Sequence, residues 1–128
     1  MENQISSGLK TLFLVHFIVG IVFALIFLLI PTVYGNVVGW EVKDPGAFRL
    51  IGAAMLGFSS TSILCFRNPV WEKVKITVVM EIVWTALGTL ATVWALLFEG
   101  FPPIAWLNVV LLGLFVIFFL IFYSRENR

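Results

Sequence analysis

Four long apolar segments alternate with short polar segments along the chain. The apolar segments cover about residues 11–30, 47–66, 74–98 and 104–123. A helix needs about 20 residues to cross a hydrocarbon core of about 30 Å, so each segment is long enough. The segments are bounded by glycine, proline, asparagine or charged residues, which commonly interrupt regular structure. The pattern therefore predicts four membrane-spanning helices.

A helical fold is favoured over a β-barrel because the apolar residues are continuous. Residues 18–29 show no alternation of polar and apolar positions, whereas a barrel strand would alternate over about ten positions. We therefore predict an all-α, polytopic membrane protein: an antiparallel four-transmembrane-helix bundle, forming a single membrane domain over residues 1–128. Asp44 should cap the second span and Pro103 should occupy the first turn of the fourth. The segment 31–46 is expected to be a loop.

The composition agrees with a membrane environment. Hydrophobic residues make up 61% of the chain, charged residues 12%, and the mean hydropathy is +1.07. A soluble domain averages about 45–50% apolar and about 25% charged residues. The first apolar run is too long for a signal-peptide core and no small-residue cleavage site follows it, so we interpret it as a retained span. The single cysteine, Cys65, cannot form an internal disulfide.

The distribution of basic residues predicts the orientation in the membrane. Six of the eight basic residues would lie on the side of the termini, namely Lys10, Arg67, Lys73, Lys75, Arg125 and Arg128. Only Lys43 and Arg49 would lie at the opposite side. Because cytoplasmic segments carry the excess of Lys and Arg, both the N-terminus and the C-terminus are predicted to be cytoplasmic.

Four polar residues inside the predicted spans are the main candidates for a functional site. Ionisable groups are costly within a bilayer, so they usually face protein or water and indicate a function. Glu81 in the third span and His16 in the first lie at a similar depth near the cytoplasmic side. Arg49 and Asn108 lie near the outer side. We predict two polar layers, His16 with Glu81 and Arg49 with Asn108, which would form an interior path or cavity.

Each candidate also has a structural interpretation. Glu81 and His16 could only hold helices together, and Glu81 could instead pair with Lys10 or Lys75. Arg49 could snorkel toward acidic residues at the outer surface, and Asn108 could form an interhelical hydrogen bond. Secondary candidates are Thr77, Thr85 and Ser60; the threonines could bond back to their own helix. The pattern Ala53-x-x-x-Gly57 predicts a close helix approach, either within the chain or in a homo-oligomer.

One part of the chain resembles a known group of proteins. Pro31-x-x-Tyr34-Gly35, followed by the sequence from Phe48 to Ala54, is similar to the first hairpin of small four-helix DoxX-like membrane proteins. The resemblance covers about a third of the chain. It implies the four-helix fold and little about chemistry, and it does not include Glu81.

Three functional hypotheses follow from these observations. The first is a minimal transporter or channel-like unit in the cell membrane, assembled as a homo-oligomer. The second is a non-catalytic accessory or assembly subunit of a membrane complex. The third is a membrane-embedded protein that binds lipid or sterol, or an enzyme that uses Glu81 and His16 as an acid/base pair. The sequence does not decide whether the protein is an enzyme, but the non-enzymatic hypotheses are preferred.

Several classes of partner have no matching pattern. The sequence contains no phosphate-binding glycine loop and no Cys/His cluster at metal-ligand spacing, so we expect no cofactor and no metal. The small, scattered basic content argues against nucleic-acid binding. The lipid bilayer is the one partner that the sequence predicts directly, and a small-molecule or ion substrate remains unspecified.

Overall fold

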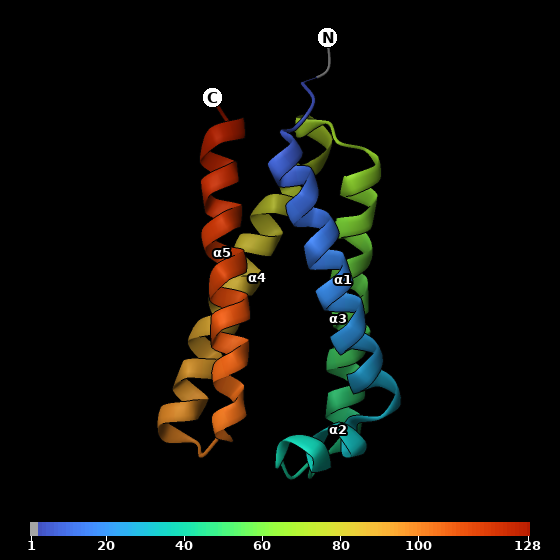
Figure 1. Ribbon diagram of the computed structural model, residues 1–128, viewed down its shortest axis with the longest axis vertical. Coiled ribbons are helices and arrows are strands. Elements are labelled where there is room, and N and C mark those ends of the chain that lie inside the picture. Colours follow the sequence, from blue (N-terminus) through green and yellow to red (C-terminus); the bar gives the residue numbers. More distant parts are fainter. Residues whose placement is uncertain (1–2) are drawn as a thin grey trace.

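The computed structural model describes residues 3–128 and consists almost entirely of helices (Figure 1). In chain order these are α1 (Ser7–Leu29), α2 (Pro31–Val38), α3 (Pro45–Arg67), α4 (Trp71–Phe98), the 3-10 helix η1 (Pro103–Ala105) and α5 (Trp106–Glu126). Within this part of the chain the only β-type pairing is an isolated bridge between Gln4 and Val70. The predicted all-α fold with four spans is therefore confirmed.

The four long helices are apolar enough to cross a membrane, and they expose large apolar side chains along their outer surfaces. Ile76 on α4 and Leu50 on α3 are 81% and 74% exposed, respectively. Water would penalise so much exposed apolar area, whereas hydrocarbon does not. The chain is thus a small multi-pass integral membrane protein.

The helix boundaries follow local capping chemistry. α1 begins four residues before the predicted span because the Ser6 side chain accepts a hydrogen bond from the Leu9 amide at 3.3 Å. Asp44 caps α3 as predicted, accepting from the Ala47 amide at 3.1 Å. Pro103 begins η1, which is the first-turn position expected for it.

The segment 31–46 is not only a loop, and that prediction was wrong. Pro31 ends α1 but also supplies the first residue of α2, where its missing N–H costs nothing. The C-cap of α2 is Gly39, with φ at +72°, a backbone conformation that favours glycine. Eight residues after a proline carry too short a periodic pattern to distinguish a helix from a loop.

The four long helices form two antiparallel hairpins arranged as an inverted V. α1 packs along α3, and α4 packs along α5, whereas contacts between the two hairpins are fewer. Figure 1 shows the hairpins meeting at the end that holds both termini and the α3–α4 turn, and separating toward the end that holds α2 and the α4–α5 connection. We call these the closed end and the open end.

The closed end is held by backbone pairing and an apolar core. The Ile5 amide donates to the Pro69 carbonyl, and the Trp71 amide donates to the Asn3 carbonyl, each at 2.9 Å. The Ser6 amide donates to the Glu126 carboxylate, also at 2.9 Å. Behind these bonds lies a buried cluster from all four long helices, including Leu9, Phe13, Cys65, Val74 and Phe119. The start of α1 thus joins the α3–α4 turn and the end of α5.

Two glycines allow α1 and α3 to pack closely. A Cβ atom at Gly52 would lie 2.7 Å from the Leu28 backbone nitrogen and 2.8 Å from the Ala24 carbonyl oxygen. A Cβ atom at Gly20 would overlap the Ser59 hydroxyl. Neither Ala53 nor Gly57 serves this contact: both are exposed, and nothing lies within 4 Å of a Cβ built at Gly57. The predicted motif therefore does not make the close approach within the chain.

Candidate functional site

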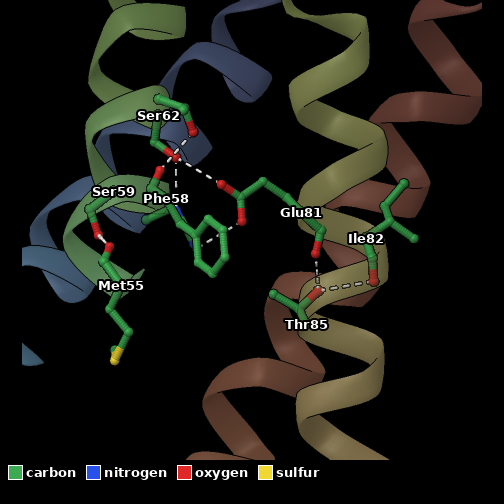
Figure 2. A network of polar contacts seen from close by, with 9 residues as sticks. Met55, Phe58, Ser59, Ser62, Glu81, Ile82 and Thr85 are labelled. Atoms are coloured by element: carbon green, nitrogen blue, oxygen red, sulfur yellow. Dashed lines mark hydrogen bonds and ion pairs between the residues drawn. The ribbon is translucent and has the colours of Figure 1, made fainter. Parts of the chain in front are cut away.

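Three polar side chains meet at the level where the closed core ends. His16 of α1 lies between α3 and α4: its Nδ1 is 2.8 Å from the Ser62 hydroxyl, and its Nε2 is 3.2 Å from Glu81 Oε2. The Ser62 hydroxyl also donates to Glu81 Oε1 at 3.2 Å. Figure 2 shows Glu81 extending from α4 toward Ser62 on α3. Exposure is 5% for His16 and 0% for both Ser62 and Glu81, so the contact is shielded from the exterior.

The hydrogen bonds limit where protons can lie. Since Ser62 has one hydroxyl proton and donates it to Glu81, its oxygen accepts the N–H of His16 Nδ1. A bare Nε2 facing a bare carboxylate oxygen would bring two acceptors together. One further proton therefore belongs to the His16–Glu81 pair, either as imidazolium with carboxylate or as imidazole with carboxylic acid. Both arrangements have zero net charge, which the low dielectric of a membrane interior favours.

This contact is not fully satisfied. Nε2 and Glu81 Oε2 are within ion-pair distance, but the ring N–H is not aligned for a hydrogen bond. Among the described residues, Oε2 is the one buried side-chain oxygen or nitrogen without a hydrogen-bond partner. Such an atom is unusual, because buried polar groups nearly always have partners. The His16–Glu81 contact is therefore a close contact without an aligned hydrogen bond, whereas Ser62 is hydrogen-bonded to both residues.

Apolar and hydroxyl side chains surround the polar contact. On α5, the rings of Phe115 and Phe119 lie 4.8 and 5.7 Å from the His16 ring, centroid to centroid, and both are nearly perpendicular to it. Thr85 donates to the Glu81 carbonyl at 2.6 Å, as the predicted back-bonding requires (Figure 2). Thr77 lies beside Cys65 and does not join the contact. All four long helices therefore converge on His16.

A cavity of about 1070 Å³ occupies the space between the hairpins on the open side of His16. His16 and Phe115 form part of its wall, but neither Ser62 nor Glu81 does. Both nitrogens of His16 point to Ser62 and Glu81, so the ring separates the cavity from the carboxylate. The cavity thus ends at the His16 ring, and the far edge of this ring contacts Glu81.

Aromatic and charged residues occupy the open end of the cavity. The Trp40 ring, in the connection between α2 and α3, lies 4.8 Å from the Phe101 ring in the connection between α4 and α5. This contact joins the hairpins across the open end. The charged residues of the cavity wall also lie in or beside these two connections: Glu41, Lys43, Asp44 and Glu99. We call this region the mouth.

The predicted outer pair does not form. The Arg49 guanidinium donates to the carbonyls of Leu28 and Leu29 at the end of α1, where a positive charge complements the helix dipole. Asn108 instead lines the cavity. Arg49 therefore caps a helix, while Asn108 offers an amide to the cavity.

Other expected partners of Glu81 lie elsewhere. The ammonium groups of Lys10 and Lys75 lie over the rings of Phe66 and Trp71, at 4.9 and 5.9 Å from the ring centroids. Ser60 is exposed and bonds back to the Leu56 carbonyl at 2.7 Å. The serine that joins the network is Ser62, two positions further along α3. Residues 59–62 are four consecutive hydroxyl residues, and the sequence gives no helix phase with which to choose among them.

The fold and the site together define a class: a multi-pass membrane protein of two hairpins, with a cavity between them and a buried His16–Glu81 contact at the closed side of the cavity. The chain has no significant match among protein-family models, curated proteins or solved structures. The resemblance of its first hairpin to DoxX-like proteins stays a prediction.

Proposed function

We propose that the protein is a small membrane carrier that binds a small molecule between its hairpins and exchanges a proton at His16 and Glu81. The observation that carries the proposal is the cavity of about 1070 Å³ that ends on the His16 ring. Ligand sites in proteins are typically clefts of about 300–1000 Å³ with mostly apolar walls and a few polar groups. This cavity has that size and that lining.

The arrangement of contacts supports movement of the hairpins about the polar layer. Within each hairpin the helices pack along their length, but between hairpins the packing is concentrated at the closed end. The Trp40–Phe101 contact is the aromatic link across the mouth. A carrier of this design would close the mouth and open the closed end, separating His16 from Glu81 and freeing their shared proton.

The unsatisfied oxygen of Glu81 favours a moving contact over a static one. If the network served only to hold the helices, Oε2 would be expected to receive an aligned hydrogen bond, since each buried unsatisfied group costs about 1–3 kcal/mol. A contact that separates during each transport cycle breaks more easily when it lacks an aligned hydrogen bond. The predicted orientation, with both termini cytoplasmic, would place the mouth at the outer side.

The second candidate is an accessory subunit in which the polar network only joins helices. One observation favours it: His16, Ser62 and Glu81 are engaged with one another, and the carboxylate does not reach the cavity. The same observation weakens the enzyme hypothesis, because an acid/base pair must contact its substrate. In a homo-oligomer, the outward-facing Ala53 and Gly57 would contact a second copy of the chain. The cavity lies within one chain and does not require such an assembly.

Thiol labelling in membrane vesicles tests the carrier proposal without knowledge of the ligand. Cys65 is the only cysteine and lies buried in the closed core, 6% exposed. If the closed end opens during a cycle, a membrane-impermeant maleimide applied to the side of the termini will label Cys65 slowly but completely. The Glu81→Ala variant should label faster, because it removes the polar contacts of α4 with His16 and Ser62 that join the two hairpins.

The matched control places the thiol in the cavity wall. In a Cys65→Ser background, Ala91→Cys should react from the mouth side, and the side from which it reacts also reports the orientation. If native Cys65 stays unlabelled from both sides while Ala91→Cys reacts fully, the closed end does not open. The accessory interpretation would then replace the carrier.

A further inference from the structure

The wall of the cavity is unusually aromatic. Eight phenylalanine and tryptophan residues line it, distributed over both hairpins and both connections. Trp84 of α4 lies beside Phe58 of α3 with 5.2 Å between ring centroids, and Trp40 contacts Phe48 edge-on and Phe101 at a tilt at the mouth. The face of an aromatic ring carries partial negative charge and attracts cations, and tryptophan does so most strongly.

The charged groups of the cavity wall also favour a positively charged ligand. Glu41, Asp44 and Glu99 are acidic, and Lys43 is the one basic residue among them, so the mouth carries a net charge of −2. Lys43 is itself 3.9 Å from Glu41. A mouth lined by one sign of charge concentrates ligands of the opposite sign. Deeper inside the cavity an anion would find few hydrogen-bond donors. Asn108 supplies the side-chain amide there.

The existing hydrogen bonds also disfavour ligands rich in polar groups. The hydroxyls of Ser59 and Thr92, which line the cavity, donate to the Met55 and Gly88 carbonyls of their own helices, at 2.8 and 2.7 Å. Both nitrogens of His16 are occupied as well. A sugar or an amino acid would therefore lose hydrogen bonds to water that the wall does not replace.

From the aromatic wall and the acidic mouth we infer that the ligand is a lipophilic organic cation, such as an aryl-substituted quaternary ammonium or phosphonium ion. This inference rests on the proposed function, because it specifies what the inter-hairpin cavity binds. The rings replace the hydration of a diffuse cation, and the apolar substituents fill the remaining volume. The acidic mouth increases the local concentration of the cation and its rate of entry.

Two ions of nearly identical shape and opposite charge provide the test. Binding of tetraphenylphosphonium and of tetraphenylborate to the purified full-length protein in neutral detergent is measured by equilibrium dialysis, with protein-free micelles subtracted. Triphenylphosphine oxide serves as the uncharged probe. We expect the phosphonium ion to bind at least about tenfold more tightly than either comparison compound at low ionic strength.

Variants then assign the effect to the cavity. Trp84→Phe keeps a ring in place but weakens its attraction for cations, so it should weaken phosphonium binding about threefold and leave borate binding unchanged. Glu99→Gln, at the mouth end of α4, should weaken phosphonium binding at low salt. Glu72→Gln, at the other end of the same helix and outside the cavity, should have no effect.

The outcomes separate the two proposals. Tighter binding of the phosphonium ion that responds to Glu99→Gln and not to Glu72→Gln supports the inference. Equal or tighter binding of the borate or of the neutral probe overturns the cation preference but leaves a ligand-binding cavity. If none of the three compounds binds, the inference is overturned, whereas the proposed function is overturned only by the absence of Cys65 labelling described above.

Discussion

Ser60 and Ser62 lie two positions apart on α3 and have opposite environments. Ser60 is exposed and bonds to its own helix, whereas Ser62 is fully buried and connects His16 with Glu81. Replacing either serine with alanine removes the same hydroxyl oxygen from the same helix. The difference between the two variants therefore reports the contribution of the polar network.

We expect Ser62→Ala to lower the free energy of unfolding by about 1–2 kcal/mol, because it leaves a buried carboxylate oxygen and a ring N–H without their partner. Ser60→Ala should change it by less than about 0.5 kcal/mol, as exposed substitutions usually do. Reversible unfolding in mixed micelles measures both values. Equal effects of the two substitutions would mean that the network does not join the hairpins.

At the residue level, the sequence predicted the His16–Glu81 pairing but not its third member. Depth along two helices was enough to place His16 opposite Glu81, since both lie inside spans where ionisable groups seek partners. Ser62 could not be chosen from four consecutive hydroxyls without the rotation of α3 about its axis. That rotation is set by the contact of Gly52 with the α1 backbone, which hydropathy does not report. Arg49 was misassigned because the carbonyls at the end of α1 were not considered as acceptors.

The helix α3 has one close face and one open face, and a glycine lies on each. Gly52 touches the backbone of α1, and Gly57 has open space around it. The same substitution at these two positions therefore tests the packing of the first hairpin.

Gly52→Ala should lower the free energy of unfolding by more than about 2 kcal/mol, because its Cβ would force two backbones apart. Gly57→Ala should be neutral or stabilising by up to about 1 kcal/mol, since alanine is the better helix former. The same micelle-unfolding measurement applies. A stability loss at Gly57 comparable with that at Gly52 would indicate that the outer face is packed against another chain.

At the level of elements, the four spans were predictable because each is a continuous apolar run bounded by breakers. Their ends were less predictable, since α1 extends to the Ser6 cap and α4 begins at Trp71, three residues before the expected span. The helix α2 was missed because eight residues after a proline carry too weak a periodic signal. Hydropathy identifies which helices enter a membrane, but it does not give the angle between them.

At the scale of the whole molecule, the angle between the two hairpins creates the cavity. A bundle whose helices pack along their whole length would fill its interior with its own side chains. Here the hairpins diverge as an inverted V (Figure 1), which leaves a packed closed end and a cavity beyond His16. The charge state of the polar layer then becomes relevant to the ligand. With the shared proton present the layer is neutral, and with the proton removed it carries one negative charge.

A bound cation and the shared proton should therefore disfavour each other, and the coupling must be reciprocal. Few other groups near this layer can ionise. Cys65 is the titratable neighbour on α3, while α5 faces the layer with Phe115 and Phe119 and α4 contributes the hydroxyl of Thr85. Raising the pH removes the shared proton and should tighten cation binding, and lowering the pH should weaken it.

The most direct test of the account is the number of protons released when tetraphenylphosphonium saturates the protein in weakly buffered micelles, followed with a pH indicator dye. We predict a release that approaches one proton per bound cation in the native protein and none in Glu81→Gln, which keeps an oxygen acceptor for Ser62 but cannot share the proton. Binding without proton release, or the same release from Glu81→Gln, would contradict a carrier in which cavity occupancy and the His16–Glu81 proton are linked.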